Sequence, residues 1–135
     1  GQKPFLFADS VRVNVAMDAT ITDEEIWYFL ELAGLKEDIE NFPDKLDTQL
    51  GEWGINLSGG QKQRLTLART LAKKPKVLFL DDCLSAVDTI TEEKILKNLD
   101  KHLKEVTLIW VAHRKSTLKY CNSTFELKPL MDGVH

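Results

Sequence analysis

Residues 56–64 read Asn56-Leu57-Ser58-Gly59-Gly60-Gln61-Lys62-Gln63-Arg64 and stand immediately before a run of apolar residues with helical spacing. Ser58 followed three residues later by Gln61 is typical of a capping box, which satisfies backbone groups at a helix start without any ligand. The same stretch offers a hydroxyl and two glycine amides at the positive end of a helix dipole, where a phosphate can bind. Two interpretations are therefore open, a helix cap and a phosphate site, and the flanking sequence is needed to choose between them.

Length and composition favour a single modest core. The chain has 135 residues, of which 43% are hydrophobic, and this suits one domain or part of one. Its net charge of -3 comes from 18 basic and 21 acidic residues mixed along the sequence, so no basic surface for nucleic acid is expected. The apolar runs are far shorter than a membrane-spanning helix, and we expect a soluble chain without a signal peptide. Gly1 begins in mid-pattern, which suggests a truncated fragment, and two cysteines suit a reducing compartment.

Helical spacing predicts three helices before residue 75. Thr22 and Glu25 form a second capping box ahead of an apolar face made by Ile26, Phe29, Leu30 and Ala33. A shorter helix is expected over residues 37–41. The helix after Ser58 stops at Pro75, and its apolar face consists of Leu65, Ala68, Leu71 and Ala72. Residues 2–16 are expected to be extended or looped, with a short, weakly patterned segment.

Two continuous apolar runs predict buried strands of a parallel sheet. Residues 77–80 are apolar throughout, which favours a strand covered on both faces. Residues 106–112 predict a second buried strand. The helix between them is expected over residues 91–103, with an inward face of Ile95, Leu96, Leu99 and Leu103. Strand, helix and strand in this order predict a right-handed parallel crossover, and a short helix near 116–120 and a strand near 124–127 complete the pattern.

Charged residues follow both predicted strands at their carboxyl ends, where open parallel sheets bind ligands. Asp81 and Asp82 follow the first strand, and His113 follows the second. An aspartate fixed by a rigid strand suits Mg²⁺ beside a nucleotide, although Asp81 can equally cap the next turn and His113 can be a structural histidine. Cys83, next to two carboxylates, is expected to pack rather than react. The sequence contains no phosphate loop of the pattern Gly, four residues, Gly-Lys, Ser or Thr, so tight binding of a nucleoside triphosphate is not expected of this chain alone.

Five motifs, taken in order, resemble the nucleotide-binding domain of an ABC transporter. They match the Q-loop, the signature, Walker B, the aspartate loop and the switch histidine, and they are Gln2, Leu57-Ser58-Gly59-Gly60-Gln61, Val77-Leu78-Phe79-Leu80-Asp81-Asp82, Ser85-Ala86-Val87-Asp88 and His113. The resemblance implies an α/β fold, with a partial P-loop NTPase-like parallel sheet and an α-helical signature subdomain. Residues 1–135 would form a partial nucleotide-binding domain without Walker A. The helical subdomain would cover residues 10–74, and the C-terminal part of the RecA-like ATPase core would cover residues 75–135.

The resemblance also implies ATP and Mg²⁺ as cofactors and a second nucleotide-binding domain as partner. In this family the signature of one subunit contacts the γ-phosphate of ATP held by the other subunit. Nucleotide contacts are thus implied for Gln2, Leu57, Ser58, Gly59, Gly60, Gln61 and Asp88, of which Asp88 would bridge the interface. Mg²⁺ would be held through water by Asp81 and Gln2, and His113 would bond the γ-phosphate.

Asp82 departs from the family pattern, which usually has a glutamate as general base after the Walker B aspartate. A general base has to reach its proton within about 3 Å or through one water, and an aspartate is one methylene shorter. We therefore interpret the ATP site that contains Asp82 as degenerate, binding ATP with little hydrolysis. The signature of this chain would then complete an active site on a different subunit, in a heterodimer similar to some multidrug exporters.

Residues 48–54 resemble the loop that marks exporters and contacts the transmembrane domains, although Trp53 stands where arginine is usual and Gln49 where glutamate is usual. The resemblance thus implies an exporter ATPase subunit at the cytoplasmic face of the plasma (inner) membrane. The fragment alone is expected to be inactive and to self-associate through exposed apolar surface and sheet edges. Two alternatives stay open: a soluble ABC-type ATPase of DNA repair or translation, which a basic surface would favour, and a non-enzymatic helical interaction module.

Overall fold

The structure is a computed structural model that describes residues 6–111, with Asp81 described by its backbone alone. The elements in chain order are α1 (Val11–Ala16), α2 (Asp23–Leu32), α3 (Lys36–Glu40), the short 3-10 helix η1 (Lys45–Asp47), α4 (Gly59–Ala72), β1 (Val77–Asp81), α5 (Thr89–His102) and β2 (Thr107–Val111). The helix and strand predicted near 116–120 and 124–127 lie outside the described residues. All the helices and strands predicted within residues 17–111 are present, with ends within a few residues of those expected.

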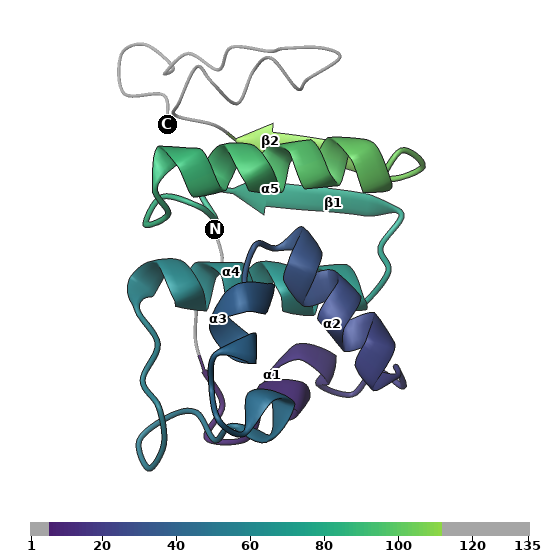
Figure 1. The fold of residues 1–135 in the computed structure, drawn as a ribbon. Coiled ribbons are helices and arrows are strands. Elements are labelled where there is room, and N and C mark those ends of the chain that lie inside the picture. The colour runs from purple at the N-terminus through teal and green to yellow at the C-terminus, as the bar shows by residue number, and fades with distance from the viewer. Residues whose placement is uncertain (1–5, 112–135) are drawn as a thin grey trace, which may run out of the picture.

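Helix α4 runs between two parts of the molecule (Figure 1). Helices α1, α2 and α3 lie on one side of it, and α5 with the two strands lies on the other. Helix α4 packs on α1 and α2, and α2 also touches α5. The helix that begins with the signature stretch is therefore the central element of the described chain.

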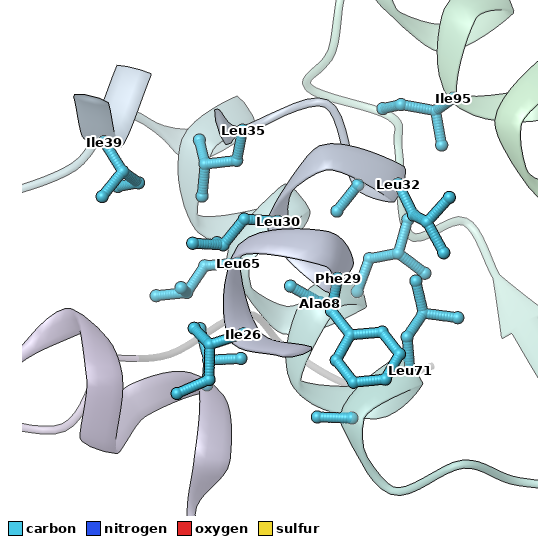
Figure 2. Packing of buried hydrophobic residues seen from close by; sticks show 14 of the residues in the cluster. Ile26, Phe29, Leu30, Leu32, Leu35, Ile39, Leu65, Ala68, Leu71 and Ile95 are labelled. Atoms are coloured by element: carbon cyan, nitrogen blue, oxygen red, sulfur yellow. The ribbon is translucent and has the colours of Figure 1, made fainter. Parts of the chain in front are cut away.

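Helix α2 forms as its capping box predicts. The Glu25 amide donates to Thr22 Oγ1 at 3.2 Å, and the Thr22 amide donates to Glu25 Oε1 at 3.2 Å. The apolar face predicted for this helix is buried, and it meets the apolar face of α4 in the core that Figure 2 shows. Both faces follow from the helical period, because residues three and four apart lie on the same side of a helix.

Helix α1 occupies part of the stretch expected to be extended or looped. Ser10 caps it by accepting a hydrogen bond from the Val13 amide at 3.1 Å. The fully buried Asn14 holds the turn before it, with Nδ2 at 3.1 Å from the Phe7 carbonyl and Oδ1 accepting from the Phe7 amide at 2.8 Å. Arg69 of α4 donates from Nε to the Asn14 carbonyl at 2.7 Å. Three β-branched valines make this a poor helix by propensity, so contacts with α4 and with the preceding turn stabilise it.

Strands β1 and β2 pair in parallel, with Val77 opposite Thr107 and Asp81 opposite Val111. Leu78 and Leu80 are buried in the core, as expected for one face of β1. The prediction of strands covered on both faces was wrong for the described chain, because Val77 and Phe79 are 56% and 59% exposed and Ile109 on β2 is 47% exposed. Successive side chains of a strand point to opposite faces, and only one face of this sheet packs against the described core.

None of the helices in residues 6–111 combines the length and the apolar character needed to cross a lipid bilayer.

Candidate functional site

The start of α4 is a complete capping box. The Gln61 amide donates to Ser58 Oγ at 3.1 Å, and the Ser58 amide donates to Gln61 Oε1 at 2.9 Å. Gln61 Nε2 also donates to Oδ2 of Asp38 in α3 at 2.9 Å. Both ends of the Gln61 side-chain amide are therefore engaged within the protein, which fixes the first turn of α4 against α3.

Three donors remain at this helix start. The amides of Gly59 and Gly60 occupy the first two helical positions, where an α-helix offers no backbone acceptor. The Ser58 hydroxyl accepts from Gln61 and still has its own proton to donate. Ser58 and Gly59 are exposed. The capping box and an anion-binding helix start are thus compatible in one structure, since the cap uses other atoms than those that would meet an anion.

Leu57 plays a different part from its neighbours. Its side chain is buried in the hydrophobic core, directly before the exposed Ser58. A buried anchor next to an exposed turn holds the backbone of that turn in place. Leu57 therefore contributes to the candidate site by fixing the position of Ser58.

The loop between β1 and α5, residues 82–88, lies directly against the start of α4. A Cβ added to Gly60 would lie 2.8 Å from the Ala86 carbonyl oxygen, so a residue with a side chain does not fit there without movement. Leu84 and Val87 anchor the loop in the core, and Ser85 and Ala86 are exposed between them. The close approach places the backbone of this loop beside the donors of α4.

Asp88 ends the loop and caps α5. Its Oδ1 accepts from the Thr91 amide at 2.9 Å, and its Oδ2 accepts from the Thr91 hydroxyl at 2.8 Å. These hydrogen bonds, the backbone amide first, hold the pKa of the Asp88 carboxyl below its ordinary value of 3.8. Asp88 is therefore an exposed carboxylate of fixed position that is ionised at neutral pH.

Gln63 is a residue of this site that the sequence did not reveal. Its Nε2 donates to Ser85 Oγ at 2.9 Å, and its Oε1 accepts from the Ala86 amide at 2.7 Å. Its only signal in the sequence is its place three residues after Gly60, on the same face of the helix. The loop it reaches is more than twenty residues away in sequence, and no local pattern predicts such a pairing.

The predicted acidic residues lie at the carboxyl end of β1. Asp81 pairs with Val111 at the end of β2, and the Asp82 amide donates to the Val111 carbonyl at 3.4 Å. Asp82 is exposed and has a left-handed backbone, with φ of 51°. Gln2 and His113 lie outside the described residues.

A magnesium site needs several oxygen ligands. Within residues 6–111, no three side chains of Asp, Glu, His or Cys come together in a way that would hold a metal ion. The predicted ligands, Gln2 and the side chain of Asp81, lie outside the part of the chain that the structure describes.

Comparison with known proteins identifies the family of this chain. The family model described as "ABC transporter" matches residues 1–85, which is more than half of the chain. The chain belongs to the ABC transporter family.

Several ABC proteins are similar over most of this chain. The uncharacterized ABC transporter ATP-binding protein YwjA of Bacillus subtilis is 44% identical over 119 residues, covering 87% of this chain and 21% of the relative. The multidrug resistance-like ATP-binding protein MdlA of Escherichia coli is 47% identical over 118 residues, covering 87% of this chain and 20% of the relative. A structure of a bacterial Atm1-family ABC exporter with ATP bound superposes with a TM-score of 0.79 at 37% identity, covering 87% of this chain and 21% of that one.

These ABC relatives confirm the family and the fold class predicted from the motifs. The mixed arrangement of helices with a small parallel sheet matches part of an ABC exporter nucleotide-binding domain. The chain spans about a fifth of the length of the relatives it matches.

Proposed function

We propose that this chain is the signature-bearing part of an ABC exporter ATPase, which couples ATP binding and hydrolysis to transport across a membrane. The observation that carries the proposal is the start of α4, where Ser58, Gly59 and Gly60 offer three donors at the positive end of a 14-residue helix. The alternatives of a soluble DNA-repair or translation ATPase and of a non-enzymatic module gain no support from the relatives, which are named as exporters and transport ATP-binding proteins.

The phosphate that these donors bind belongs to ATP held by a second nucleotide-binding domain. This follows the resemblance to ABC nucleotide-binding domains, in which the signature of one subunit contacts the γ-phosphate of ATP held by the other, and residues 1–135 contain no phosphate loop. Asp88 faces the same partner as an ionised carboxylate. Gln2 and His113 stay predicted γ-phosphate contacts, and Asp81 and Gln2 stay predicted Mg²⁺ contacts through water.

The proposed chain consists of a helical subdomain over residues 10–74 and a part of the ATPase core over residues 75–135. Within the first, the loop over residues 48–54 faces the transmembrane domains. Trp53 in this loop is 91% exposed, which suits a contact with another part of the transporter. The proposed location is the cytoplasmic face of the plasma (inner) membrane.

The ATP site that contains Asp82 is degenerate. The Asp82 side chain is one methylene shorter than that of the usual glutamate. The backbone of Asp82 is also left-handed, with φ of 51°. A general base contributes about 10²- to 10⁴-fold to a rate when it is well placed. The proposed transporter therefore pairs this domain with a different one, whose ATP site is completed by the signature of this chain.

The test is the ATPase activity of the whole transporter that contains this chain, assembled with its partner. Asp82→Glu is expected to raise the rate at least about tenfold at the degenerate site, because the longer side chain reaches the attacking water. Asp82→Asn is the control, and it removes the base without lengthening it. The proposal is wrong if wild-type homodimers already hydrolyse ATP as fast as the Asp82→Glu variant.

The 135 residues alone provide a second check. Without a phosphate loop they are expected to be inactive and to show no micromolar affinity for ATP in a calorimetric titration. Micromolar binding by this chain alone would contradict the assignment of the nucleotide to a partner domain.

A further inference from the structure

Gln63 joins the two parts of the candidate site. It lies on α4, one turn beyond the three free donors, and the residue is only 9% exposed. One end of its amide donates to the Ser85 hydroxyl at 2.9 Å, and the other end accepts from the Ala86 backbone at 2.7 Å. Both polar ends of a buried side chain are thus satisfied by one loop.

The loop touches α4 through backbone as well. Gly60 leaves space for the Ala86 carbonyl, which would lie 2.8 Å from a Cβ at that position. Gly60 therefore permits the close approach, and Gln63 fixes the register of the loop by binding the Ala86 amide and the Ser85 hydroxyl. Two independent contacts, one steric and one polar, define how the loop sits on the helix.

We propose that Gln63 is a positioning residue, which fixes the loop over residues 82–88 to the start of α4. The donors of Ser58, Gly59 and Gly60 and the carboxylate of Asp88 then form one rigid surface. A partner domain meets both elements at once, so docking needs no ordering of the loop at the moment of closure. This inference rests on the proposed function, because the surface has a ligand to bind only if a partner domain supplies a phosphate.

The consequence for catalysis is a particular kinetic split. ATP binds to the partner domain before the two domains close, so the KM for ATP depends little on Gln63. Closure of the sandwich needs the loop and the helix start in register, and a misplacement of about 1 Å in such a constellation costs about a hundredfold in rate. Loss of Gln63 is therefore expected to lower kcat while leaving KM nearly unchanged.

Hydrogen exchange in the 135-residue chain tests the contact itself. Gln63→Met keeps the side-chain volume and removes both hydrogen bonds, and the Ala86 amide is expected to exchange at least about tenfold faster. Gln63→Glu still accepts from Ala86 and from the Ser85 hydroxyl, so it is expected to restore most of the protection. The amide of Leu99 in α5 reports global unfolding. If Ala86 and Leu99 accelerate equally in Gln63→Met, the local contact is refuted.

ATPase kinetics of the whole transporter with its partner test the function. Gln63→Met is expected to lower kcat at least about tenfold with KM within about twofold of wild type. Ser85→Ala removes one of the two hydrogen bonds and is expected to have an intermediate kcat, which keeps the test valid if Gln63→Met folds poorly. Leu71→Ala is the matched control, since it destabilises the same helix through the core without touching the loop.

The outcomes separate this inference from the proposed function. A wild-type assembly that hydrolyses ATP, with Gln63→Met and Ser85→Ala equally active, overturns the positioning role and leaves the proposed function standing. A fall in kcat that Leu71→Ala reproduces also overturns it, because stability alone then explains the loss. A wild-type assembly without ATPase activity overturns the proposed function and the positioning role of Gln63 in it together.

Discussion

Two adjacent glycines at the start of α4 have different surroundings. A Cβ at Gly59 would lie 3.5 Å from the Ala86 Cβ, which is ordinary contact, and a Cβ at Gly60 would lie 2.8 Å from the Ala86 carbonyl oxygen. Neither glycine has a positive φ. The requirement for glycine at position 60 therefore comes from the space that the neighbouring loop needs, and position 59 has no such requirement in the described structure.

The pair Gly59→Ala and Gly60→Ala tests this difference. Alanine in a helix is favoured over glycine by up to about 1 kcal/mol, so Gly59→Ala is expected to leave stability unchanged or to raise it. Gly60→Ala forces the loop away from α4 and is expected to cost about 1–3 kcal/mol, as overpacking does. Urea unfolding of both variants measures the two effects, and equal stabilities would contradict the close approach of Ala86.

Residues of the candidate site differ in how far the sequence predicts them. The capping box of Ser58 and Gln61 follows from a spacing of three residues, because both partners lie in one helical turn. Gln63 could not be predicted in this way, since its partners Ser85 and Ala86 lie in a different element and reach it only through the tertiary fold. The roles of Asp81, Gln2 and His113 in binding Mg²⁺ and phosphate stay predictions.

At the scale of elements, α1 is a helix that local sequence patterns do not predict. Helix α2 was predicted because its capping box and its apolar period agree. Helix α1 has a capping serine but is only 6 residues long, and its valines give no clear helical period. The contact of Asn14 with Arg69, which joins it to α4 across 55 residues of sequence, stabilises it together with the fully buried Val11 and Val15. Short helices of this kind are fixed by buried polar contacts, which no sequence window contains.

The helix caps and the ion pairs beside them predict that the free energy of unfolding falls at acidic pH, which we call the acid limb. Hydrogen bonds from Arg12 lower the pKa of Asp23 below 3.8, those from Lys74 and then Thr22 lower the pKa of Glu25 below 4.5, and those from Thr91 lower the pKa of Asp88 below 3.8. A carboxyl with a lowered pKa in the folded state stabilises the fold above its unfolded pKa and loses this effect as pH falls.

The contribution of these carboxylates is therefore expected to be constant above about pH 5.5 and to decline as pH falls below 4.5 and through 3.8. Urea midpoints between pH 3 and pH 8 measure it. Asp88→Asn keeps a capping oxygen without a titrating group, so its acid limb should be shallower than that of wild type. An identical slope for the variant and wild type would contradict the assignment to Asp88.

At the scale of the whole molecule, the sheet has one covered and one open face. The continuous apolar run of β1 predicted two covered faces, because parallel sheets are usually buried on both sides. Within the described chain, Leu78 and Leu80 meet the core while Val77 and Phe79 are more than half exposed. The run correctly identified a parallel strand. It could not show that the second covering layer is absent from residues 6–111. An apolar pattern indicates the environment that suits a strand, and it does not indicate whether the covering element lies within the same residues.

The open face predicts self-association of the 135-residue chain. Val77, Phe79 and Ile109 place apolar side chains side by side across the two paired strands, and a second copy of the chain can cover them with its own open face. Burying a side chain the size of phenylalanine contributes about 1.5–3 kcal/mol. Sedimentation equilibrium is therefore expected to show concentration-dependent association, and Phe79→Thr should weaken it at least about tenfold.

Ile90 supplies the matched control for this prediction. It is also a large exposed apolar residue, 71% exposed, but it lies in the first turn of α5 and not on the sheet. Ile90→Thr is therefore expected to leave the association constant within about twofold of wild type, since it removes a similar apolar area from a different surface. A wild-type chain that stays monomeric at high concentration contradicts self-association. If Ile90→Thr weakens the assembly as much as Phe79→Thr does, the association does not depend on the open face of the sheet.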